Sequence, residues 1–266
     1  MMGAATVRAP FGGFLVDLFG AVKAMLADAI SFFVAAVAIW LIRTPEVKPE
    51  PPPAGVRLST QIADGLRFVY RHPLIRPIAL AGPIFSFTIA GTNALGLIYA
   101  IKELHWTPFM SGLVLGISGL GGLLGGVLAQ KLLATYRIAR IVLWSSLVYV
   151  VGDLPLALVA PGPAGAVIVC VGWTLLLVGA LVLQISQRTL RQLLTPREMQ
   201  GRLAATTRWL SWGAAPLGAL AAGALAELIG MQLTLLVAAI LVAAAPLTLW
   251  LSPLRTLKED PVPVAV

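Results

Sequence analysis

One carboxylate interrupts a long apolar stretch of this sequence. Asp153 stands between Gly152 and Leu154-Pro155, well inside an apolar run over 139–160. An ionisable side chain in lipid is costly and, as a rule, faces the interior of a helix bundle. One interpretation is a site for a proton or a substrate cation. The alternative is a structural carboxylate near the outer leaflet, which satisfies backbone groups freed by Pro155.

Five further polar side chains are candidates for the same pathway: Asn93, Gln184, Gln187, Arg208 and Asp28. Asn93 offers a donor and an acceptor, either to a substrate or to a neighbouring helix. Gln184 and Gln187 lie one helical turn apart and are expected to share a face, lining a vestibule or meeting interfacial water. Arg208 either pairs with a carboxylate in one conformation or extends to the inner headgroups. Asp28 is expected to be structural.

The composition shows which kind of element must hold these residues. Hydrophobic residues make up 59% of the 266 positions and charged residues 11%, and the mean hydropathy is +0.92. Soluble domains are roughly 45–50% apolar and about 25% charged. A soluble enzyme, a disordered chain and a secreted disulfide scaffold are therefore excluded, the last also because Cys170 is the only cysteine. An all-α polytopic membrane protein remains.

The apolar runs predict about eight transmembrane helices, since a helix needs ~20 apolar residues to cross a bilayer. They are expected over 4–19, 24–42, 77–101, 109–130, 139–160, 164–186, 203–226 and 231–251. The run over 109–130 carries glycines four residues apart, at Gly112/Gly116 and Gly121/Gly125. Such spacing lets two helix backbones approach closely, whether for static packing or for sliding.

The basic residues predict the orientation. If both termini are cytoplasmic, all 19 lysines and arginines except Lys23 and Lys102 fall on the cytoplasmic side. This alternation from loop to loop follows the positive-inside rule. It also explains the net charge of +8 without a nucleic-acid partner.

The interruption over 44–76 divides the chain. Its first part is rich in proline and predicts an extended tether. Leu58, Ile62, Leu66 and Val69 then fall at helical spacing. That helix is expected either on the inner membrane surface or packed on the protein's own cytoplasmic end. The expected parts are a two-helix piece (1–43), this linker with its helix (44–76), a six-helix half (77–252) and a cytoplasmic tail (253–266).

Several segments together resemble one known family. They are QRTLRQLLTPRE at 187–198 with Gly201-Arg202, RWLSWGAAPLGA at 208–219, GLRFVYRHPLIR at 65–76 and ADAISF at 27–32. They are similar to major facilitator superfamily exporters, in the branch of the enterobactin exporter and macrolide-efflux proteins. That resemblance implies a fold of twelve helices in two halves. The chain would supply helices five to twelve, as an N-terminally truncated, incomplete major facilitator fold.

The resemblance implies a secondary active transporter in the bacterial cytoplasmic membrane. It would export small hydrophobic or amphipathic molecules by alternating access, coupled to protons. Its partners would be that substrate, protons, the lipid bilayer and a separate chain supplying the missing helices. A non-transporting remnant is the alternative. A lipid-modifying membrane enzyme is disfavoured because no catalytic constellation is evident, so we expect no enzyme, no cofactor and no metal.

Overall fold

A computed structural model describes residues 21–41, 58–257, 259 and 261. The chain divides into two compact units, Met1–Arg57 and Leu58–Val266, and each is described by itself. In the first unit, helix α2 (Ala21–Trp40) matches the helix expected over 24–42. The helix expected over 4–19 and the proline-rich tether lie outside the described residues.

The second unit is a bundle of six helical spans, each long and apolar enough to cross a membrane. Four are single helices: α4 (Ile75–Lys102), α5 (Pro108–Thr135), α8 (Pro163–Leu194) and α9 (Arg197–Ile229). Two are broken: α6 (Ile138–Asp153) with α7 (Pro155–Leu158), and α10 (Met231–Leu241) with α11 (Ala244–Trp250). The 3-10 turn η1 (Pro253–Thr256) follows. All six spans expected from 77 onward are confirmed, and the described residues contain no strand.

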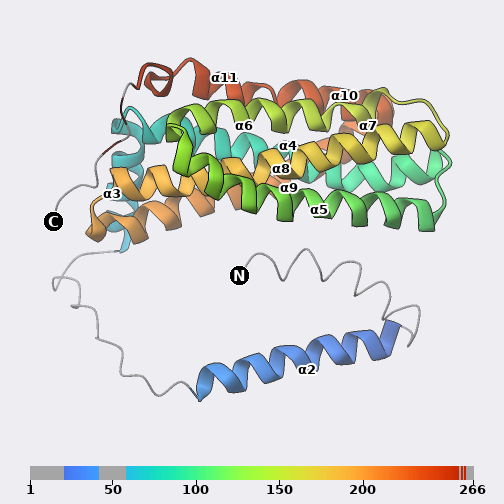
Figure 1. Ribbon diagram of the computed structural model, residues 1–266, viewed down its shortest axis with the longest axis horizontal. Helices are drawn as coiled ribbons and strands as arrows, with labels where there is room; N and C mark the ends of the chain where they lie inside the picture. The colour runs from blue at the N-terminus through green and yellow to red at the C-terminus, as the bar shows by residue number, and fades with distance from the viewer. Residues whose placement is uncertain (1–20, 42–57, 258, 260, 262–266) are drawn as a thin grey trace. The chain divides into compact units, whose positions relative to one another are not determined.

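The helices begin and end at residues suited to those positions. At the start of α5, the Thr107 hydroxyl accepts a hydrogen bond from the backbone N–H of Met110 at 3.1 Å, and Pro108 occupies the first turn. Gly230 joins α9 to α10 with φ 86°, a backbone conformation that glycine adopts without strain. Short turns such as this one reverse the chain, so spans that follow one another in the sequence run in opposite directions (Figure 1). The closely packed pairs α4/α9 and α5/α8, which are not consecutive, run parallel.

Close backbone contacts hold α5 against α8. A methyl group on Gly121 would collide with the backbone carbonyl of Thr174, and one on Gly125 would lie 2.8 Å from the carbonyl oxygen of Val178. Glycines at this spacing let the helix axes approach. By contrast, Gly112 faces open space. The predicted glycine packing is thus confirmed for one part of the α5 stripe.

Helix α3 (Leu58–Arg71) packs on the protein itself, the second of the two placements expected for it. Asp64 and Arg202 of α9 form an ion pair at 3.9 Å. Val69 is buried in a cluster with Ile75 and Leu203. This contact fixes α3 beside the beginnings of α4 and α9.

The basic residues gather at one end of the bundle. Short connections alternate between its two ends, so the end bearing α3 also holds the α5–α6 turn, the α8–α9 turn and the end of α11 (Figure 1). This end of the unit carries Arg71, Arg137, Arg188 and Arg255, whereas Lys102 lies at the opposite end of α4. The six-helix unit therefore has the charge polarity of a protein embedded in a bilayer.

Candidate transport pathway

Asp153 is buried at the last residue of α6, where the helix breaks before Pro155. Its side chain is 4% exposed, and Oδ1 has no hydrogen-bond partner. Among the described residues the only ion pair is Asp64–Arg202, so no cation neutralises Asp153 there. The structural alternative requires the Asp153 carboxylate to accept hydrogen bonds from backbone groups that Pro155 leaves unpaired. Oδ1 accepts none, so the structure does not support that role for this atom.

Helix α4 packs beside the part of α6 and α7 that holds Asp153. Tyr149 lies one turn before it and packs edge-on against Phe85 of α4, with ring centroids 4.7 Å apart. One turn further along, Leu156 contacts α4 at Gly96, where an added methyl would lie 3.1 Å from its side chain. These two contacts place the α6–α7 junction, which holds Asp153, beside α4.

Thr92 lies on the stripe of α4 that joins Phe85 and Gly96. It is 5% exposed, and its hydroxyl has no hydrogen-bond partner. Its neighbour Asn93, the α4 candidate predicted from the sequence, is exposed and forms no side-chain hydrogen bond in the described structure. The phase of the helix distinguishes the two positions, since Thr88, Thr92 and Tyr99 share the buried face.

A second polar layer lies near the basic end of α8. Gln187 is 9% exposed, and its Nε2 has no hydrogen-bond partner. Ser186 is fully buried, and its hydroxyl also has no hydrogen-bond partner. Gln184 is exposed. The two glutamines therefore differ in burial although they lie one turn apart, and their place in a vestibule stays a prediction.

Arg208 lies on an exposed face of α9. Its guanidinium stands over the ring of Trp212, 5.3 Å from the centroid. Only 11% of the most apolar stretch of this span is buried, against 56% for the span containing α6 and α7, and α9 also has the lowest hydropathy of the six. Asp28 lies in α2, and its side chain is outside the described part of the structure.

Three comparisons connect this arrangement to known proteins. A family described as "Transmembrane secretion effector" matches residues 3–265. The multidrug efflux pump Tap of Mycolicibacterium fortuitum is 24% identical over 236 residues, which cover 85% of this chain and 54% of the pump. A crystal structure of a variant of the nucleoside transporter NupG has a TM-score of 0.57 at 15% identity, covering 86% of this chain and 64% of NupG.

The chain thus spans about half the length of the curated relative and less than two thirds of NupG. The likeness to NupG shows a major facilitator fold, and the apolar spans show a multi-pass membrane protein. The family match covers almost every residue, and the chain belongs to the transmembrane secretion effector family of major facilitator transporters.

Proposed function

We propose that this protein takes part in secondary active export of small hydrophobic or amphipathic molecules from a bacterial cell, by alternating access coupled to protons. The family and the similarity to a multidrug efflux pump support the direction of transport. The motif at 187–198 favours the enterobactin-exporter and macrolide-efflux branch. The few polar atoms inside the bundle suit substrates that are largely apolar.

The observation that carries the coupling proposal is Asp153. A buried carboxylate without a cation costs free energy, so a protein that only needed to pack would have an apolar side chain there. In the proposed cycle its carboxyl group takes up a proton in one conformation and releases it in another. In the same cycle, the Thr92 hydroxyl, which is buried on α4 without a hydrogen-bond partner, is the proposed donor to the ionised carboxylate.

Arg208 indicates which face of the unit does not contact lipid tails in the proposed arrangement. A charged side chain on an exposed helix face is unfavourable against lipid tails, and α9 is the least apolar span. We therefore propose that this face of α9 meets water or another transmembrane element. Because the chain spans about half the length of the pump, the proposal includes a separate chain that supplies the remaining helices.

The test is efflux of a fluorescent hydrophobic cation from cells that express this chain, with and without its neighbouring genes. Asp153→Asn keeps the shape of the side chain and removes the exchangeable proton, and it should abolish proton-driven efflux. Glu103→Gln is the matched control, since Glu103 is an exposed carboxylate at the end of α4. Equal dye retention in expressing and empty cells under both conditions would contradict the transport proposal. Normal efflux by Asp153→Asn would contradict the coupling role alone.

A further inference from the structure

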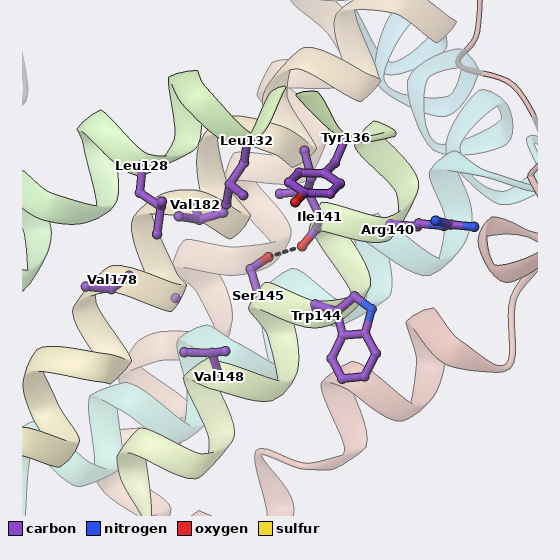
Figure 2. Close-up of a pocket in the computed structure, with 11 residues that line it drawn as sticks. Leu128, Leu132, Tyr136, Arg140, Ile141, Trp144, Ser145, Val148, Val178 and Val182 are labelled. Atoms are coloured by element: carbon purple, nitrogen blue, oxygen red, sulfur yellow. Dashed lines mark hydrogen bonds between the residues drawn. The ribbon is translucent and has the colours of Figure 1, made fainter. Parts of the chain in front are cut away.

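A groove opens on the outside of the six-helix unit between α5 and α6. Both helices pack along α8 but make few contacts with each other, so α8 forms the floor of the space between them. Its volume is about 440 Å³. The floor consists of Val178, Gly179 and Val182, and the walls include Leu128 and Leu132 of α5 and Val148 of α6 (Figure 2).

The inside of the groove is apolar for two structural reasons. Gly179 leaves the floor without a side chain, because a methyl group there would lie 2.8 Å from the backbone nitrogen of Tyr149 on the closely packed α6. Ser145 is the hydroxyl-bearing residue of the α6 wall, and its Oγ donates to the carbonyl oxygen of Ile141, as Figure 2 shows. The hydroxyl proton on that wall is therefore already used within the helix and is not available to donate to a polar ligand.

The end of the groove nearest the α5–α6 turn is cationic. Tyr136 and Arg140 line it, and Figure 2 shows the Arg140 side chain extending away from the apolar walls. Lys131 and Arg137 on the same hairpin are exposed. The sequence has no acidic residue between Glu103 and Asp153, so the hairpin supplies no counter-charge of its own.

We propose that this groove binds an anionic phospholipid of the surrounding bilayer, with an acyl chain between α5 and α6 and the phosphate at Arg140 and Tyr136. The charge at one end and the apolar walls beyond it match the two parts of such a lipid. From Arg140 to Val148 the wall is about 12 Å long, which suits the upper part of an acyl chain. Trp144, 61% exposed, stands between these two positions, where indoles favour the boundary between headgroups and tails.

The groove is separate from the proposed transport pathway. Asp153, Thr92 and Gln187 do not line it, and Asp153 lies at the junction of α6 and α7 instead. The walls of the groove face outward, since Leu128, Trp144 and Val148 are exposed. In a membrane this side of the unit meets lipid, which is present there at high concentration.

Native mass spectrometry of the purified, lipid-depleted full chain tests the proposal. Dioleoyl phosphatidylglycerol should bind more tightly than dioleoyl phosphatidylcholine. Arg140→Gln removes one charge-assisted contact and should weaken phosphatidylglycerol binding on the order of tenfold. Val148→Trp and Leu128→Trp fill the groove and should weaken binding of both lipids. Arg76→Gln and Val167→Trp are matched controls, because both positions are exposed and neither lines the groove.

Three results would overturn the proposal. The first is equal affinity of the wild-type chain for the two lipids. The second is unchanged phosphatidylglycerol binding in Arg140→Gln together with both tryptophan variants, each with wild-type circular dichroism. The third is loss of binding of a fluorescent lipophilic cation in the tryptophan variants while phosphatidylglycerol binding is retained, which would assign the groove to a transport substrate.

Discussion

At the scale of single residues, the bundle contains polar atoms that its packing does not need. Asp153 Oδ1 and the Thr92 hydroxyl are both buried without hydrogen-bond partners. Burial of such an atom costs about 1–3 kcal/mol compared with an apolar group of the same shape. The conformation described here is therefore expected to be less stable than one in which these positions are apolar.

Substitution by apolar residues should show this cost directly. Asp153→Leu and Thr92→Val are expected to raise the free energy of unfolding by about 1–3 kcal/mol and about 1 kcal/mol, respectively. Thermal melting in detergent micelles measures the change, with Glu103→Leu as the exposed control for Asp153→Leu. A lower melting temperature for both variants would mean that the two side chains have partners that stabilise the fold.

His72 has a different role, because it lies outside the membrane spans and caps α4. Its Nδ1 accepts hydrogen bonds from the backbone N–H groups of Leu74 and Ile75 at 3.2 and 3.3 Å. Burial lowers the pKa of His72 below its ordinary value of 6.5. Both effects favour the neutral imidazole in the folded protein, since a protonated Nδ1 cannot accept.

The cap should therefore make stability depend on pH. Its contribution is complete above about pH 6.5, the ordinary pKa of histidine, and is lost as the pH falls through the lower pKa of the folded state. His72→Asn offers an oxygen in place of Nδ1 without titrating in this range. Its melting temperature should change less than that of the wild type between pH 7.5 and pH 5, conditions chosen to bracket the titration. Parallel pH profiles would refute the cap as the cause.

At the scale of elements, the glycines of α5 separate into two groups by what they face. Gly121 lies against the α8 backbone, whereas Gly112 and Gly116 face open space. The sequence spacing is the same in both groups, so spacing alone could not tell which pair packs. Whether a glycine is packed depends on which helix lies beside it, and that is known only from the three-dimensional fold.

Alanine at these positions should distinguish the groups. Gly121→Ala must push α5 away from α8 and is expected to cost about 1–3 kcal/mol, the range for overpacked cores. Gly112→Ala should be neutral or stabilise the protein by about 0.4–1 kcal/mol, because alanine lowers the conformational entropy of the unfolded chain relative to glycine. Chemical denaturation in micelles compares the two. Similar losses at both positions would indicate that the α5–α8 contact is looser than described.

The same limit applies to other elements. Hydropathy predicted the six spans from 77 onward, because lipid exposure constrains every residue of a spanning helix. It did not predict the break between α6 and α7, where Pro155 starts a new helix. Hydropathy also left two placements for α3, on the membrane surface or on the protein itself. The contacts of Asp64 with Arg202, and of Val69 with Ile75 and Leu203, support the second placement.

At the scale of the whole molecule, composition was enough for the fold class, and the candidate site was predicted only in part. Asp153 was identified because a carboxylate stands out in an apolar run. Thr92 was missed because a threonine does not, and its importance comes from burial and the lack of a partner. A polar residue of this kind can be identified only when the packing of the helices around it is known.

The orientation of the molecule gives the last prediction. Cationic residues gather at one end of the six-helix unit, and moving such charges across a membrane is opposed during insertion. That end should therefore face the cytoplasm. In a Cys170→Ala background, single cysteines at Tyr70, Glu198 and Glu103 sample both ends. A membrane-impermeant maleimide should label Glu103→Cys in intact cells, and Tyr70→Cys and Glu198→Cys only after permeabilisation. Equal labelling of all three in intact cells would overturn both the orientation and the bilayer-spanning arrangement, because both ends of the unit would then be accessible from the same side of the membrane.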